Sequence, residues 1–183
     1  MHAIAQTDPI AAFNERAKAR GWTLSCMPAQ GFERRELKSA LALWRAKAGT
    51  RTMPERSDMT ARDMKPFLTH MSLLERIGAG QSARYRARLH GTALTGYAGD
   101  KTGLFLDEVI PAYLVGSYTG IYDTVLELRT PLRVVSHFQA PGIDYLVGES
   151  LVAPLSVVGK DTPLILSVTY AEPRYKADAH SDE

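Results

Sequence analysis

Apolar residues recur at helical spacing near the start of the chain. Residues 8–21 predict a short helix, with Asp8 as its N-cap, Pro9 at its first position and Gly21 as its end. A loop that contains proline and glycine then separates this helix from the rest of the chain. The pattern therefore indicates an N-terminal helical extension over residues 1–30.

A stronger helical pattern follows the extension. Residues 32–49 predict a helix that ends at Gly49, with arginine and lysine between its apolar positions. Those apolar positions are Leu37, Leu41, Trp44 and Ala48. A polar connection comes next, in which residues 60–65 predict a helical turn that Pro66 would end.

From His70 onward the pattern is typical of strands. Residues 70–77 and 83–90 predict two strands joined by a glycine-containing link. The second strand alternates between an apolar face and a face of three arginines, which are Arg84, Arg86 and Arg88. Such a basic face is usually solvated or covered by acidic residues, and an anion site is the alternative.

The second half of the chain predicts one long helix and three further strands. Residues 111–128 form a single apolar stripe at spacings of four and three. Residues 132–140, 144–158 and 163–172 are rich in β-branched and aromatic residues and are separated by turns. The order of elements predicts an α+β domain over residues 31–175, in which helices pack on one face of an antiparallel sheet. Residues 176–183 are expected to be a flexible acidic tail.

The composition is that of an ordinary globular protein. The 183 residues are 45% hydrophobic and 23% charged, enough for one domain with a real core. Cys26 is the one cysteine, so no intrachain disulfide can form and a reducing, cytoplasmic location is expected. We expect no signal peptide and no membrane helix, because no long apolar run occurs.

The charge distribution argues against nucleic acid as a partner. Residues 1–66 hold 12 Lys and Arg against 7 Asp and Glu, a surplus of five positive charges. A nucleic-acid surface would gather such charges in a stripe, whereas these are scattered over predicted helices. Solvated helix faces explain them better.

The segment HGTALTGYAGDKTG, residues 90–103, looks like a phosphate-binding loop but departs from the pattern. Gly91 and Gly96 have the required spacing, yet Tyr97 and Ala98 occupy the positions of the lysine and the threonine. We therefore interpret the glycines as structural: they permit bends around a short helical turn, which Thr92 would cap.

No catalytic or metal-binding constellation emerges from the motifs. None of the five histidines lies at metal-ligand spacing from another, and the cysteine is distant, so no metal site is expected. A small hydrolase or isomerase with an acid–base pocket is the alternative function, and its candidate groups are His90, His137 and Glu149.

Aromatic residues gather in the middle of the chain. They could simply fill the core, or they could line a cavity between sheet and helices that holds a small molecule. The candidate ligand-binding residues are Tyr85, Tyr97, Tyr118, Tyr122, Ser136, Phe138 and Tyr145.

Three stretches resemble the PAS domain family, and more narrowly the short stand-alone PAS-like proteins of alphaproteobacteria. They are the Trp44 helix with GTRTMPERSDM after it, the run LLERI…ARYRARLHGTALTGYAGDKTGLFLDEV, and the late hairpin GESLVAPLSVVGKDTPLILSVTYAE. The middle stretch is the most specific, and together they cover residues 34–172.

This resemblance implies a five-stranded antiparallel sheet, preceded by a helix that often mediates dimer contacts. It implies a sensory or regulatory module that binds a small molecule, a signalling partner or both, and that forms a homodimer. It does not identify a cofactor. Covalent flavin is not expected, because Cys26 precedes the domain, and haem is not expected, because residues 91–131 contain no histidine.

Overall fold

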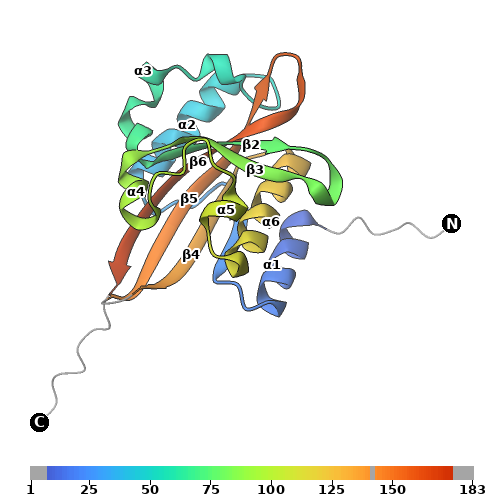
Figure 1. The fold of residues 1–183 in the computed structure, drawn as a ribbon. Helices are drawn as coiled ribbons and strands as arrows, with labels where there is room; N and C mark the ends of the chain where they lie inside the picture. Colours follow the sequence, from blue (N-terminus) through green and yellow to red (C-terminus); the bar gives the residue numbers. More distant parts are fainter. Residues whose placement is uncertain (1–7, 141–142, 175–183) are drawn as a thin grey trace, which may run out of the picture.

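The structure is a computed structural model that describes residues 8–140 and 143–174. Its centre is an antiparallel sheet of six strands in the order β1-β4-β5-β6-β2-β3 (Figure 1). The strands are β1 (Leu24–Pro28), β2 (Met71–Ile77), β3 (Arg84–His90), β4 (Leu132–Ala140), β5 (Ile143–Val157) and β6 (Lys160–Arg174). The five strands from β2 to β6 confirm the predicted pair and meander.

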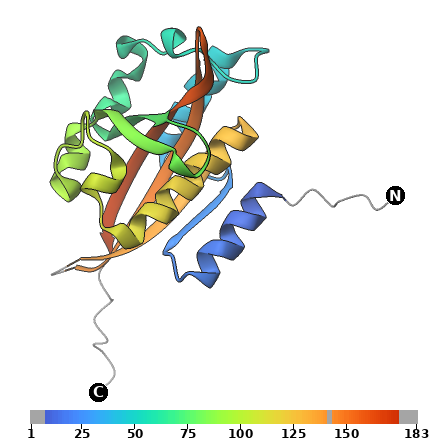
Figure 2. The same ribbon diagram turned by 45° about the vertical axis from the view of Figure 1, so that its right-hand side comes forward.

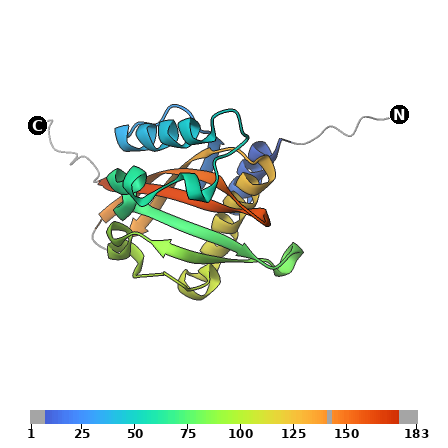
Figure 3. The same cartoon turned by 90° about the horizontal axis from the view of Figure 1, so that it is seen from above.

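Helices lie on both sides of this sheet. The longer ones are α1 (Pro9–Ala19), α2 (Arg35–Ala48) and α6 (Ala112–Leu128), and the short ones are α3 (Ala61–Met64), α4 (Thr92–Ala98) and α5 (Leu106–Val109). Three 3-10 helices complete the set: η1 (Arg56–Asp58), η2 (Lys65–His70) and η3 (Gly80–Ser82). Seen from above, α2 lies on one side of the sheet, and α4 and α5 lie on the other (Figure 3). The α+β class is confirmed, while α2, expected to precede the sheet, covers its second face.

Strand β1 is the element that the sequence did not predict. Leu24 and Cys26 are 5% and 1% exposed, and the strand pairs with β4 at the edge of the sheet. Asn14 of α1 holds it in place, because its side chain bonds both the N–H and the carbonyl of Cys26 at 3.0 and 2.8 Å. Part of the predicted loop is therefore a sixth strand. The contact with Asn14 that stabilises it cannot be recognised from the five residues of the strand, which end in a proline.

Helix α1 packs closely along α6, as Figure 2 shows. A Cβ atom on Gly120 would lie 3.1 Å from the Phe13 ring, and one on Gly116 would lie 3.0 Å from the Trp22 ring. The two glycines therefore allow the aromatic rings to reach the α6 backbone. Asp8 accepts a hydrogen bond from Ile10 N at 3.0 Å, which confirms it as the N-cap of α1.

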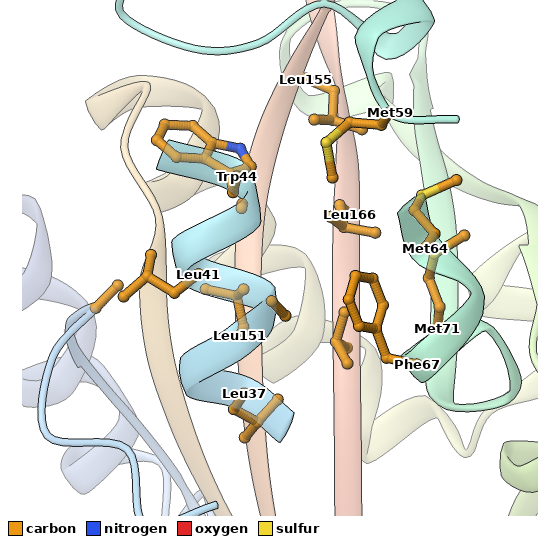
Figure 4. Close-up of a cluster of buried hydrophobic side chains, with 14 of the residues drawn as sticks. Leu37, Leu41, Trp44, Met59, Met64, Phe67, Met71, Leu151, Leu155 and Leu166 are labelled. Atoms are coloured by element: carbon orange, nitrogen blue, oxygen red, sulfur yellow. The ribbon is translucent and has the colours of Figure 1, made fainter. Parts of the chain in front are cut away.

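The face of the sheet under α2 is a closed apolar core (Figure 4). Leu151, Leu155 and Leu166 of the sheet are completely buried there, beneath Leu37 and Trp44 of α2. The remaining side is closed by side chains from the segment between α2 and β3, which are Met59, Met64, Phe67 and Met71. The indole N–H of Trp44 donates to Pro154 O at 2.9 Å, which leaves no unsatisfied donor in this core contact.

A carboxylate from the sheet caps the N-terminus of α2. Glu149 accepts hydrogen bonds from the backbone N–H groups of Glu33 and Arg34 at 3.0 and 3.1 Å. Its other partner is Arg133, whose Nε lies 2.7 Å from the same carboxylate. Since Arg34 itself provides no side-chain cap, Glu149 serves that role across the sequence.

Two local predictions differ from the structure. Pro66 does not end the turn of α3, because the chain continues into η2 with Pro66 in the first turn, where its missing N–H costs nothing. Thr92 does not cap α4, whose N-cap is Gly91 without a side-chain hydrogen bond.

Candidate functional site

The sheet face opposite α2 is divided into two halves. Under α6 it is apolar and aromatic, with Leu74, Val152 and Ile165 buried against Val125 of the helix. Helices α4 and α5 and the start of α6 lie on the same side of the sheet (Figures 1 and 2). The other half carries small hydroxyl side chains in place of apolar ones.

We call this second half the hydroxyl floor. Its members alternate with the residues of the α2-side core along their strands, so they point to the opposite face. Strand pairing brings them together, since Ser72 lies opposite Ser167 and Ser150 lies opposite Thr169. The hydroxyl floor consists of Ser72, Ser136, Ser150, Ser167 and Thr169, and the four serines are 6–8% exposed.

The floor hydroxyls bond mainly to one another. The Oγ atom of Ser150 lies 2.8 Å from Oγ1 of Thr169, which also contacts the Ser167 Oγ at 3.4 Å. Ser136 donates to Gly148 O at 3.5 Å. A hydroxyl has one donor and two acceptor sites, so these pairs leave acceptor capacity for a ligand.

His90 stands at the β3 edge of the floor. Its Nδ1 lies 2.9 Å from the Ser72 hydroxyl, while its Nε2 is buried without a hydrogen-bond partner. Burial, and then the nearby Lys101 ammonium, lower the pKa of His90 below its usual value, against a smaller opposing effect of Asp100. A buried nitrogen without a partner is rare in proteins and needs an explanation.

Lys101 is 8% exposed and precedes Thr102, whose hydroxyl accepts from His90 N at 3.2 Å. The segment that carries it runs along the outer edge of β3, where Gly103 N donates to Ala87 O at 2.7 Å. From there the side chain reaches Val109 O at the end of α5, with Nζ 3.4 Å from that oxygen. Burial lowers the pKa of Lys101. Within the described part of the chain, no carboxylate pairs with this ammonium.

Three of the predicted aromatic residues come together in the apolar half. The Tyr85 and Tyr122 rings lie 5.1 Å apart, and Tyr118 lies 6.5 Å from Tyr122. Tyr85 donates to Asp123 Oδ1 at 2.5 Å. Burial raises the pKa of Tyr118 to about 12 and raises the pKa of Tyr85 and Tyr122 further. These rings fill the space under α6.

The other predicted ligand residues have different positions. Ser136 lies on the hydroxyl floor, 6% exposed. Tyr97 is in α4, Phe138 in β4 and Tyr145 in β5, but their side chains lie outside the described residues. Sequence reasoning missed the other floor hydroxyls and Lys101. A sequence signal existed for the hydroxyls alone. Ser167 and Thr169 stand at alternate positions of the last strand, and Ser150 lies in the strand before it.

Gly91 and Gly103 of the segment 90–103 have structural roles, as the glycine pattern indicates. A Cβ atom on Gly91 would lie 2.3 Å from Thr69 O, so only glycine fits there. Asp100 accepts from Thr102 N at 2.9 Å, and Gly103 has a φ of 83°. This turn brings the backbone of Lys101 alongside β3, where Thr102 Oγ1 accepts from His90 N.

The three groups of the acid–base alternative do not share one site. His90 faces the hydroxyl floor, whereas Glu149 lies on the α2 side and is held by Arg133 and two backbone N–H groups. His137 has the β4 parity of Arg133, on the side opposite Ser136. The sheet therefore separates His90 from the other two.

The three arginines of β3 are paired rather than free for an anion. Arg84 bonds Asp107 and Glu108 of α5 at 2.7–3.1 Å. Arg86 and Arg88 lie 3.5 and 3.4 Å from Glu75. Coverage by acidic residues, one of the predicted explanations, describes this face.

Surface grooves occur at the far end of α6, away from the hydroxyl floor. One of about 370 Å³ is open and of mixed charge, with Arg76, Asp123 and Asp161 among its lining residues. Among the described residues, no group of histidine, cysteine and carboxylate side chains could hold a metal ion. No helix in the described ranges has the length and apolar character of a membrane span.

Comparison with known proteins gives one match. A family model described as PAS domain matches residues 33–169. No curated protein and no solved structure matches the chain. The matched range contains the hydroxyl floor, His90 and Lys101, and it begins after β1.

Proposed function

The chain belongs to the PAS domain family, and from this premise we propose that it is a regulatory module that senses a small molecule bound over the hydroxyl floor. PAS domains are sensory and regulatory modules, and domains with this fold bind many different ligands. The fold therefore does not identify the ligand, and the residues of the site have to. The observation that carries it is a buried sheet face built of hydroxyls, with a buried histidine nitrogen that has no partner.

Physical cost supports this reading of the floor. A sheet face that served only packing would gain about 0.8 kcal/mol for each buried CH₂, as the α2 side does. Five hydroxyl side chains and an imidazole at equivalent positions forgo that gain. A polar ligand gives such groups a use, because it bonds to their remaining lone pairs and protons.

We further propose that the module acts through contact with a partner protein or a second copy, without catalysis of its own. Residues 1–30 would be an extension ahead of the family match, which begins at residue 33, and this extension adds β1 to the sheet and packs α1 on α6. The apolar sides of α1 and α2 are buried within their own chain. A dimer through these helices would therefore use their charged outer surfaces.

Native mass spectrometry of the purified protein tests the proposal. We expect a mass above that of the bare chain, and we expect Ser150→Val and Ser167→Val to lose most of the excess. Ser25→Val is the matched control, since Ser25 is an exposed β1 residue on the edge strand. A bare mass for the wild type, with no gain on incubation in a cell metabolite extract, would contradict ligand sensing.

A further inference from the structure

We propose that the ligand is a small hydroxylated carboxylic acid, with its carboxylate on Lys101 Nζ and His90 Nε2 and its hydroxyls on the floor. The proposal rests on the function proposed above and names the chemical class that this site selects. Two groups with unused donors carry it: His90 at the edge of the floor, and Lys101 in the turn whose Thr102 hydroxyl accepts from His90 N at 3.2 Å.

Lys101 supplies the charge that recognises an acid. An ammonium group has three donors, and a buried one is costly unless an opposite charge compensates it. Here Nζ makes one long hydrogen bond, to Val109 O at 3.4 Å, and the described residues place no carboxylate beside it. Asp100, its neighbour in sequence, turns instead to the N–H of Thr102. A bound carboxylate would supply the missing partner.

His90 supplies a second donor with a defined direction. When the Ser72 hydroxyl donates to Nδ1 across their 2.9 Å contact, the ring proton is on Nε2. That Nε2 is buried without a partner, so an acceptor is what the site lacks at this atom. Burial, and then the Lys101 charge, lower the pKa of His90 and favour the neutral ring. One carboxylate oxygen can accept from each of the two residues.

The charge balance distinguishes a carboxylate from a phosphate. Lys101 is one positive charge, which matches one carboxylate, whereas a phosphate carries up to two negative charges. The cations of the edge strand β3, which are Arg84, Arg86 and Arg88, are paired with acidic side chains. The segment 90–103 also departs from the phosphate-binding pattern, because Tyr97 and Ala98, and not a lysine and a threonine, follow Gly96.

The floor accounts for the rest of the ligand. The four serines and Thr169 offer hydroxyl donors and acceptors across four strands, from Ser72 to Ser136. An apolar acid would leave this capacity unused, so hydroxyl or keto groups on the carbon chain are required. A short hydroxy acid meets both conditions.

NMR of the full chain labelled with ¹⁵N-histidine tests this inference, with the monocarboxylates glycerate and lactate as probes. The His90 signals are assigned from their loss in His90→Gln. We expect the two acids to shift the His90 Nε2 resonance, while glycerol, butyrate and inorganic phosphate shift it at least tenfold more weakly. Lys101→Met should weaken binding of the acids about 10–100-fold, the loss of one charged hydrogen bond. Lys38→Met, on the exposed side of α2, is the matched control.

The outcomes separate the ligand class from the function. Acids that bind equally well to the wild type and to Lys101→Met overturn the inference, as does preferential binding of glycerol or phosphate. Should Lys101→Met not fold, Lys101→Gln replaces it. A retained neutral molecule in native mass spectra, with no response to the acids, overturns the acid class and leaves the sensory function standing. No retained molecule and no response to any probe or extract would remove both.

Discussion

The two faces of the sheet are built from the same strands but differ in the polarity of their buried side chains. Neighbouring residues of β5 show it: Leu151 is completely buried in the α2-side core, and Ser150, one position earlier, lies on the hydroxyl floor. The α2 side is filled with aliphatic, methionine and aromatic side chains. The other side is apolar beneath α6 and carries five hydroxyl side chains beyond it. The α2 side holds the larger of the two apolar clusters, and the opposite face is the one that we propose for binding.

The sharpest way to break this comparison is a pair of substitutions at these neighbouring positions. Leu151→Ala should lower the free energy of unfolding by about 2–5 kcal/mol, because it removes packed methyl groups and leaves a cavity. Ser150→Ala should cost about 0.5–1.5 kcal/mol, the net value of one hydrogen bond. Urea denaturation of both variants measures the difference. Equal losses would mean that the floor is also a packing surface.

The cap of α2 predicts the next largest effect. Glu149→Gln should cost about 1.5–3 kcal/mol, since it removes the charge that Arg133 and two N–H groups of the helix N-terminus share. Glu172→Gln is the control: its ion pair with Arg34 is at the surface, with 55% of the Glu172 side chain exposed. We expect the control to change stability by less than about 0.5 kcal/mol. Urea denaturation measures both variants. Equal losses in the free energy of unfolding would contradict the role of Glu149 as the cap of α2.

At the proposed ligand site we expect a substitution of Lys101 to stabilise the protein rather than destabilise it. In ligand-free protein, Lys101→Met should raise the free energy of unfolding by about 0.5–2 kcal/mol, because a buried ammonium without a counter-charge is replaced by an apolar chain of similar length. Differential scanning calorimetry of protein refolded from denaturant checks this. A destabilised variant would show that Lys101 has a structural partner after all.

The apolar half predicts a smaller effect, at alkaline pH. Burial raises the pKa of Tyr85, Tyr118 and Tyr122 above the unfolded value of about 10. The folded state then keeps protons that the unfolded state releases, so stability is fully present below about pH 10 and falls as pH rises above it. Absorbance at 295 nm should show that Tyr85, Tyr118 and Tyr122 ionise only at pH values above 10. Ionisation of all tyrosines together near pH 10, with the fold intact, would contradict this burial.

Much of the fold could be predicted because its elements carry their own patterns. The helices α1, α2 and α6 have apolar sides at helical spacing, and the β2–β3 pair and the later meander have strand alternation. Strand β1 was not predicted, because its five residues depend on the Asn14 side chain for their position.

The candidate site was harder to predict, because it arises from register. Ser72 meets Ser167, and Ser150 meets Thr169, only through pairing of strands that are far apart in sequence. Lys101 sits in a glycine-rich turn, and only the backbone bonds of that turn to β3 direct it inward. Tyr85, Tyr118 and Tyr122 were found by their aromatic character, yet they pack with one another under α6. These tyrosines lie on the same side of the sheet as the hydroxyl floor, which is the proposed binding site.

Hydrogen–deuterium exchange, before and after the retained ligand is removed by unfolding and refolding, tests the division of labour between the faces most directly. We predict faster exchange without ligand in peptides that contain Ser72, Lys101 and Ser167, and no change in α2. Exchange that is unchanged everywhere, or that changes only in α2, would contradict the assignment of binding to the hydroxyl floor.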